Sequence, residues 1–390
     1  MENSDYDLIV VGAGPAGLFT AREAAGMGCK VLVLEEHGEV GKPERCAGLF
    51  SLSGLRMLGM PLSPSYVQNV VRGAVFSSPS GREFVLDTKK PVAVVTSREM
   101  FDKSLARQAA LKGAEIVTGE KVVGIVPSER SPSVRTSNSS ASAKMVVDAE
   151  GRSGFLARQV WKGWRPRGWL PIIQAVVENH RMDREFVYLY FKDYLKDFFA
   201  YLVPIDDELG KLGVAARKDT RKLFFRFLQE EFGHVRILST TSASIYTGPP
   251  LELRQTGRVL AVGDVAGQAK ATTGGGVVYG GLCALETGRY VANFLLNGAG
   301  AREYRSRMRR IYAQLKSIHR LRVLISRIQP KFYDTIFKAA GDIGLDAWLS
   351  SEGDMDRHAD TASAMLSSGM ALKLLMRSIL QAVKDALGIP

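Results

Sequence analysis

The segment VGKPERCAGLFS, residues 40–51, places a thiol, Cys46, just after a Gly-Lys-Pro turn and before two small residues. A thiol in such a position can serve as a proton donor, as a group that orients a ligand, or as a small packing residue. Lys42 and Arg45 would favour the thiolate, and a thiolate cannot donate a proton. The residues alone therefore leave the role of Cys46 open among these three.

A glycine motif, Gly12-x-Gly14-x-x-Gly17, follows the apolar run at 8–11 and opens an alanine-rich segment expected to be a helix at 16–27. Glu35 ends the next apolar run, 23 residues after Gly12. This order predicts a βαβ unit that binds a dinucleotide, with the pyrophosphate at the helix N-terminus. The carboxylate of Glu35 is expected to accept hydrogen bonds from the ribose hydroxyls.

A second glycine loop, GDVAGQAKATTGGG, follows the apolar run RVLAV, and Asp264 stands where that run ends. The three glycines 274–276 precede a helix that is expected to begin near Val277. A second helix N-terminus beside the same ligand would stabilise negative charge on a reduced flavin ring. The two glycine loops together predict FAD as the cofactor.

These motifs predict an α/β protein in which a Rossmann-like nucleotide-binding domain is interrupted by a β-sheet substrate domain and followed by a helical region. We expect the nucleotide-binding domain to comprise residues 1–60, 96–165 and 250–300. The substrate domain is expected at 61–95 and 166–249, and the helical region at 301–390.

Local patterns predict smaller elements as well. Residues 71–88 read as a hairpin turning at Ser-Pro-Ser-Gly, and Ser97 as the N-cap of a helix. The polar, low-complexity stretch 127–143 is expected to be a mobile loop.

Composition narrows the class of protein. Three cysteines far apart, no basic leader and no long apolar run predict a cytoplasmic protein without disulfides. The five histidines show no metal-ligand spacing, and no Gly-x-Ser-x-Gly motif suggests hydrolysis. No metal is therefore expected.

The net charge of +12 is concentrated in residues 302–338, which hold eleven Lys and Arg but two acids. A helical apolar stripe runs through the same segment, and Leu372, Leu375, Ile379, Val383 and Leu387 form another near the C-terminus. Such helices can lie on an anionic membrane, bind an acidic protein or dock on their own chain with a solvated basic face. We expect a peripheral anionic membrane surface as a partner, and no nucleic acid.

The sequence resembles the flavoproteins that include the aromatic hydroxylases, on the first glycine motif, the turn VVDAEG at 146–151 and the pair Gly263-Asp264. Within them, GKPERCAGLFS and GDVAGQAKATTGGG are most similar to the geranylgeranyl reductases, in particular the archaeal digeranylgeranylglycerophospholipid reductases. The resemblance covers the first 300 residues. It implies FAD-dependent saturation of isolated prenyl double bonds in membrane-lipid precursors.

The resemblance also implies site residues. FAD contacts are implied for Ala16, Glu35, Cys46, Ala47, Leu49, Arg98, Val122, Asp264, Gly276 and Val277; the glycine motifs add Gly12, Gly14, Gly17 and Gly275. Arg98, at a helix start, is expected to reach a phosphate. The aromatic motif FFAYLVP implies that the substrate binds Phe199, Tyr201, Val203 and Pro204, although an ordinary buried strand would read the same way. Members of the family usually have Pro at the position of Ala271. The Trp of the family's aromatic motif is absent from FFAYLVP.

An isolated alkene is a poor hydride acceptor, so its reduction needs an apolar channel and a placed proton donor. Cys46 is the catalytic candidate, with water or a lipid hydroxyl as the alternative acid. The electron donor is expected to be a ferredoxin or NAD(P)H, since no second dinucleotide motif is present. Three other functions stay open: an FAD monooxygenase of a small aromatic, a non-redox flavin-dependent isomerase or cyclase, and a non-enzymatic flavin-binding membrane module.

Overall fold

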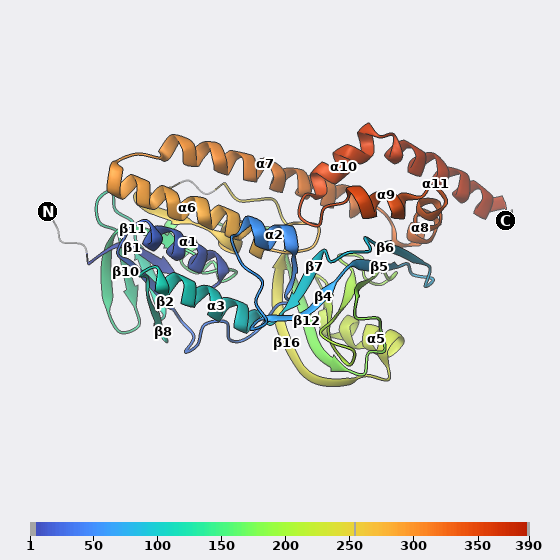
Figure 1. The fold of residues 1–390 in the computed structure, drawn as a ribbon, viewed down its shortest axis with the longest axis horizontal. Coiled ribbons are helices and arrows are strands. Elements are labelled where there is room, and N and C mark those ends of the chain that lie inside the picture. Colours follow the sequence, from blue (N-terminus) through green and yellow to red (C-terminus); the bar gives the residue numbers. More distant parts are fainter. Residues whose placement is uncertain (1–4, 253–254, 388–390) are drawn as a thin grey trace.

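The first glycine motif lies in a βαβ unit, as predicted. A computed structural model describes residues 5–252 and 255–387, and its chain path is drawn in Figure 1. The unit consists of β1 (Tyr6–Val11), α1 (Pro15–Gly26) and β2 (Val31–Glu35), with β1 and β2 parallel. Residues 8–11 and 31–34 are buried because this sheet is covered on both faces.

The nucleotide-binding sheet has the strand order β8-β2-β1-β11-β10-β9, and β17 pairs with the C-terminal half of β11. Helices α1, α3 (Arg98–Leu111) and α6 (Val277–Asn297) pack together on one face of this sheet (Figure 1). The second glycine loop begins with the short helix η1 (Gly263–Ala266). The remaining strands are β8 (Glu115–Thr118), β9 (Val122–Val126), β10 (Ser133–Thr136), β11 (Ser140–Asp148) and β17 (Val259–Ala261).

The prediction of a mobile loop at 127–143 was wrong. Strand β10 and the start of β11 occupy much of this stretch and form an antiparallel meander with β9. Val134 and Ala143 are buried, whereas the serines between them mostly face outward. The high serine content hid this alternation of inward and outward side chains.

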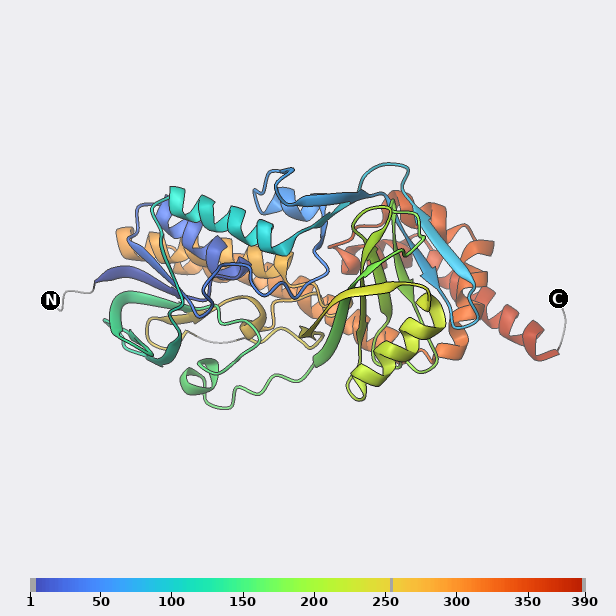
Figure 2. The same cartoon turned by 90° about the horizontal axis from the view of Figure 1, so that it is seen from below.

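The second large sheet has the order β16-β12-β15-β14-β13-β5-β6 and is antiparallel except where β13 pairs with β5. One face is covered by α5 (Thr220–Phe232), which buries three phenylalanines against it (Figure 2). The predicted hairpin is β5 and β6. The strands are β5 (Gly73–Ser77), β6 (Glu83–Asp87), β12 (Trp169–Glu178), β13 (Phe186–Tyr190), β14 (Ala200–Pro204), β15 (Leu209–Ala215) and β16 (Arg236–Tyr246).

A small sheet of order β3-β7-β4 lies between the two large ones (Figure 1). Its strands are β3 (Leu49–Ser51), β4 (Val67–Val71) and β7 (Ala93–Thr96), and α2 (Leu52–Met57) follows β3 directly. The short helix α4 (Ala157–Val160) packs near β9. The segment 61–95 thus contributes strands both to the small sheet and to the second large sheet.

The C-terminal region is helical, as predicted. Helix α7 packs along α6 through Met308, Leu315, Ile318 and other residues of the predicted stripe, so its apolar face docks on its own chain. Helices α8, α9 and α11 form a cluster against β5 and β6. The elements are α7 (Ala301–Ile325), η2 (Pro330–Phe332), α8 (Tyr333–Asp342), α9 (Leu345–Glu352), α10 (His358–Ser367) and α11 (Met370–Leu387).

Candidate functional site

The first glycine loop leaves backbone donors free at the N-terminus of α1. Gly12 has φ +99°, and a Cβ there would lie 2.6 Å from Ala149 O, so only glycine makes this turn. A Cβ at Gly17 would overlap the Gly12 backbone, so this glycine permits the helix to cross close to the turn. By contrast, no atom lies within 4 Å of a Cβ built on Gly14, and no side chain caps the helix. The loop therefore presents open space in front of a helix N-terminus that no side chain caps, as an anionic pyrophosphate requires.

Glu35 lies beside this loop at the end of β2. Its Oε2 accepts a hydrogen bond from Ala13 N at 2.8 Å, and its Oε1 accepts one from His37 N at 3.0 Å. The His37 ring nitrogen Nδ1 is 2.5 Å from the same Oε1. Val122 is buried in a hydrophobic cluster that includes Leu34, the residue before Glu35 on β2. Contact of Glu35 with a ribose and of Val122 with the cofactor stay predictions.

The second glycine loop meets the first at close range. A Cβ on Gly263 would lie 2.8 Å from the Cβ of Ala16, which is on the first turn of α1. Asp264 points at Gly276, whose Cβ would lie 2.5 Å from Asp264 Oδ1. Burial raises the pKa of Asp264, and the charge of Arg98 opposes the rise.

Gly276 is the N-cap of α6, which begins at Val277 as predicted, and no side chain caps this helix or places an acid in its first turn. The chain thus has two uncapped helix N-termini on neighbouring loops. This arrangement fits FAD, whose pyrophosphate and reduced ring both carry negative charge. Gly275 lies within the loop, and its O accepts a hydrogen bond from Lys270 N at 3.0 Å.

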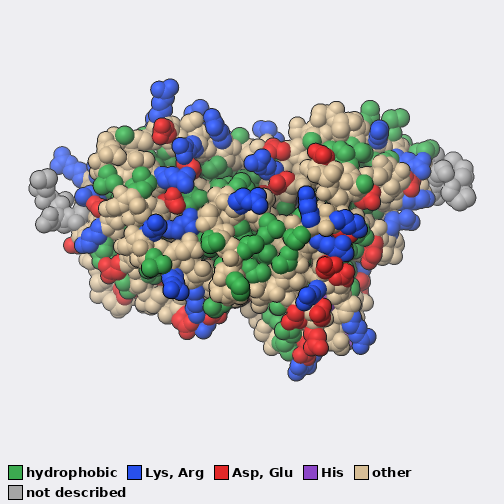
Figure 3. Space-filling model, viewed as in Figure 1, with side chains coloured by type: hydrophobic (Ala, Val, Ile, Leu, Met, Phe, Trp, Pro, Cys, Tyr) green, Lys and Arg blue, Asp and Glu red, His purple; other side chains and the backbone are tan. Residues whose placement is uncertain are grey.

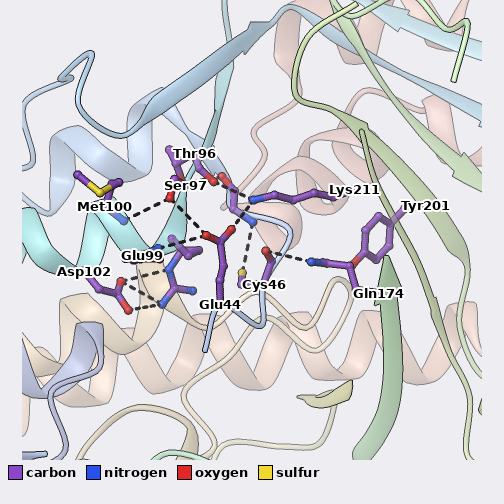
Figure 4. A network of polar contacts seen from close by, with 12 residues as sticks. Glu44, Cys46, Thr96, Ser97, Glu99, Met100, Asp102, Gln174, Tyr201 and Lys211 are labelled. Atoms are coloured by element: carbon purple, nitrogen blue, oxygen red, sulfur yellow. Dashed lines mark hydrogen bonds and ion pairs between the residues drawn. The ribbon is translucent and has the colours of Figure 1, made fainter. Parts of the chain in front are cut away.

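Cys46 lies where the nucleotide-binding region meets the second sheet (Figure 4). Its half-buried sulfur accepts a hydrogen bond from Gly48 N at 3.4 Å. Its carbonyl accepts one from Gln174 Nε2 at 3.4 Å, and Gln174 Oε1 in turn accepts one from Tyr201 O–H at 2.8 Å. Two residues predicted from separate motifs, Cys46 and Tyr201, are therefore joined through one side chain of β12.

Arg98 supplies the positive charge next to Cys46. Burial disfavours the charged guanidinium and would lower its pKa, but the interactions with Asp102 and Cys46 outweigh burial and raise the pKa of Arg98. Its guanidinium bonds to the Asp102 carboxylate at 3.0–3.2 Å, which fixes its direction at the start of α3. A phosphate contact by Arg98 stays a prediction.

The two cations expected to favour a Cys46 thiolate lie on the surface of the Cys46 loop. Lys42 pairs with Glu39 at 2.9 Å, and Arg45 is exposed. That these two side chains favour the thiolate stays a prediction. Helix α3 brings a further cation, Arg98, to Cys46 from more than fifty residues further along the chain.

The predicted substrate residues lie on or next to β14. Tyr201 and Val203 pack in a cluster with Ala47 and Leu49, which lie on the Cys46 side of the junction. A Cβ on Gly213 would overlap the Tyr201 ring, so this glycine on β15 makes room for it. Burial raises the pKa of Tyr201, and a negative charge at Cys46 would raise it further.

The other two substrate candidates have different surroundings. Phe199 stacks on Phe198 at 4.2 Å between ring centroids and lies beside Phe191, which contacts Tyr333 of α8 at 4.4 Å. This aromatic group offers an apolar wall. Pro204 is buried at the end of β14, where its carbonyl accepts a hydrogen bond from Asn69.

Two ion pairs with buried lysines were missed from the sequence. Lys211 of β15, whose side chain is 4% exposed, reaches Glu44 in the Cys46 loop at 2.6 Å and Thr96 O at 3.1 Å. Burial would raise the pKa of Glu44, but Lys211 outweighs it and lowers that pKa. Lys270 of the second glycine loop pairs with Asp356, between α9 and α10, at 2.6 Å. Each pair joins residues more than eighty positions apart, so no local pattern could reveal it.

Within the described residues, no group of three or more His, Cys, Asp or Glu side chains is arranged to hold a metal ion.

Comparison with known proteins gives consistent similarities. Residues 7–159 match the family described as FAD dependent oxidoreductase. The chain is 26% identical to a digeranylgeranylglycerophospholipid reductase of Methanocaldococcus jannaschii, over 87% of this chain and 92% of that protein. It is also 26% identical to an uncharacterized protein of the same organism, over 96% of this chain and 99% of the other. A crystal structure of a geranylgeranyl bacteriochlorophyll reductase-like protein from Thermoplasma acidophilum superposes with a TM-score of 0.80 at 19% identity, covering 93% of this chain and 98% of that one.

The fold, the two glycine loops and these similarities identify an FAD-dependent oxidoreductase with a Rossmann-like FAD-binding fold. Among such proteins, the similarity is to digeranylgeranylglycerophospholipid reductases, which confirms the resemblance predicted from the sequence motifs. The predictions of FAD as cofactor and of the fold class are likewise confirmed.

Proposed function

We propose that the protein saturates isolated double bonds of geranylgeranyl chains in archaeal-type ether-lipid precursors. The observation that carries the proposal is the junction of Cys46, Gln174 and Tyr201, where the backbone carbonyl of Cys46 is linked through Gln174 to an apolar, aromatic strand. The similarity to digeranylgeranylglycerophospholipid reductases supports this choice of substrate class.

Alkene reduction adds a hydride to one carbon and a proton to the other. Bound FAD would supply the hydride and thereby return to its oxidised form. The side chains of this chain would do the rest: Tyr201, Val203 and the aromatic group around Phe199 would hold the prenyl chain and exclude water. Cys46, or a water or lipid hydroxyl next to it, would donate the proton.

Arg98 matters to this scheme because it lies next to the thiol. If Cys46 donates the proton, the neighbouring guanidinium would balance the negative charge left on the sulfur. Asp102 holds the guanidinium in place, and Gln174 holds the Cys46 carbonyl. These contacts would keep the sulfur in a fixed position during the transfer.

The reductant and the location are further parts of the proposal. Electrons would come from an acidic ferredoxin or from NAD(P)H that docks transiently. Exposed arginines on α7 would suit either an acidic protein or an anionic membrane, and we place the enzyme at the cytoplasmic membrane surface, where its lipid substrate resides. Among the described residues, no helix has the length and apolar character needed to cross a membrane.

The deciding experiment is anaerobic incubation of the purified protein with dithionite and an unsaturated geranylgeranyl ether lipid, followed by mass spectrometry. Saturation adds two hydrogens for each double bond. An unchanged mass with a rearranged product would indicate an isomerase or cyclase. Product formation that requires oxygen and consumes it in proportion, with an aromatic substrate, would indicate a monooxygenase.

A further inference from the structure

Helix α11 turns its apolar face outward. Its large apolar side chains with the greatest exposure are between 47% and 63% accessible: Leu372, Leu375, Met376, Ile379 and Leu380. They recur every three or four residues and so share one face of the helix. Val383 and Leu387, the last positions of the predicted stripe, lie outside the residues whose side chains are described.

The opposite face of α11 makes the contacts with the protein. Leu374 packs in the cluster beneath the helix, Arg377 pairs with Asp342 at 2.7 Å, and Gln381 is 4% exposed. A helix docked only for stability would bury the leucines and expose the glutamine. Here the arrangement is reversed, and the adjoining α10 adds Leu366, which is 71% exposed. Hydrophobic side chains gather over this edge in Figure 3, at its upper right.

Charge indicates what covers this face. Lys373 is exposed on α11 next to the stripe, and α7 carries the exposed arginines Arg302, Arg305, Arg309 and Arg320. Helix α10 contacts both α7 and α11, and Figure 1 shows the three helices along one edge of the molecule. With a net charge of +12, two copies of this chain would repel each other, whereas an anionic surface would attract it.

We propose that α11 lies in the headgroup layer of an anionic bilayer, with Leu375, Met376 and Ile379 inserted among the acyl chains. Basic side chains along the same edge would contact the lipid phosphates, as in other interfacial amphipathic helices. This inference deepens the proposed function and rests on it, since an enzyme that acts on membrane lipids must reach them at the bilayer.

The position of α11 also ties the membrane to the reaction site. Helices α8, α9 and α11 pack on Phe84 and its neighbours in β5 and β6, at the edge of the sheet that carries the predicted substrate strand. The loop before α10 carries Asp356, which is bonded to Lys270 of the second glycine loop. A bilayer at α11 would therefore lie against the same region that supports both the substrate sheet and the FAD loop.

The test is co-sedimentation of the FAD-bound protein with vesicles of phosphatidylcholine that contain increasing phosphatidylglycerol. Binding is expected to grow with the anionic fraction and to fall with salt. The double substitution Leu375→Gln with Ile379→Gln should lower partitioning by about tenfold or more, because each leucine-sized side chain contributes that order to transfer into an apolar phase. Leu111→Gln, at an exposed position on α3, is the matched control and should bind as the wild type does.

A second pair of substitutions separates charge from insertion. Arg305→Glu with Arg309→Glu should weaken binding mainly at low salt. Lys316 is left unchanged because it already pairs with Glu252. Sedimentation equilibrium should give a mass that the α11 substitutions do not change.

The proposal is overturned if the wild type does not bind anionic vesicles, or if the α11 double variant binds them unchanged. A dimer that the same double variant dissociates would show instead that α11 covers a second copy. Since these vesicles contain no unsaturated ether lipid, the result is independent of turnover. The dithionite assay decides the reaction separately.

Discussion

The buried pair of Lys270 and Asp356 allows a sharp prediction about stability. The Lys270 side chain is 7% exposed and that of Asp356 1%, and their charged atoms are 2.6 Å apart. Lys270 Nζ also donates to Met355 O at 2.9 Å, and Asp356 accepts a hydrogen bond from the Ser51 hydroxyl. The pair thus forms a buried polar link between the C-terminal helices and the second glycine loop.

Asp356→Asn keeps the shape and removes the charge, so Lys270 is left buried without a counterion. Loss of one partner of a buried pair typically costs about 3–5 kcal/mol, since the remaining charge stays out of water. We expect the free energy of unfolding to fall by that order. The measurement is urea denaturation of the FAD-free protein, followed by circular dichroism.

The double variant Lys270→Met with Asp356→Asn is the control, because it removes the stranded charge. It should recover most of the loss, since apolar replacements of buried pairs are often close to neutral. FAD affinity should likewise fall in the single variant and recover in the double variant, because Lys270 N and O both bond to glycines of the loop that leads into α6. A single variant that loses less than about 1 kcal/mol, or a double variant as unstable as the single one, would refute the reasoning.

Three further predictions concern the cofactor, the thiol and pH. Gly14→Ala should leave the stability of the FAD-free protein nearly unchanged but weaken FAD binding about tenfold or more in a fluorescence titration, whereas Gly38→Ala, also with no atom within 4 Å of its Cβ, should not. Cys46→Ser should bind FAD with an unaltered spectrum and slow anaerobic alkene reduction on the order of 100-fold; unchanged turnover would make the thiol structural. Burial and the charge of Lys270 lower the pKa of His358 to about 4, so the free energy of unfolding should fall by up to about 3 kcal/mol as the pH drops from about 6.5 towards 4. His358→Gln should reduce this loss in urea denaturation at several pH values. A variant with the same pH profile as the wild type would contradict the prediction.

The sequence predicted those parts of the site in which backbone geometry within one turn limits the residue type. Gly12 must have a positive φ and Gly17 must let a helix cross close by, so the glycine spacing, together with the apolar runs on either side, predicts the βαβ unit. The same holds for Gly276, where an uncapped helix begins at the predicted residue. In each case, backbone geometry within one turn limits the choice of residue.

The charged contacts of the site are not local, and sequence reasoning missed them. The sequence indicated Lys42 and Arg45 as the cations near Cys46, and α3 adds Arg98, which no local pattern links to the thiol. Glu44, two residues before Cys46, pairs with Lys211 of β15, and no local pattern indicates this pairing. Such pairs depend on how distant elements pack, and their residue types are as common on surfaces as in sites.

These distant contacts hold together the junction at which we propose that the reaction takes place. Each element that meets there is held by a buried polar link: Gln174 holds the Cys46 carbonyl, Lys211 holds Glu44, and Asp356 holds Lys270. Buried charges and amides are costly unless they are paired, so each link strongly disfavours any other packing of the two sheets and the C-terminal helices. The thiol, the glycine loops and the aromatic strand are therefore fixed relative to one another before any substrate binds, which a reaction that must deliver hydride and proton to adjacent carbons requires.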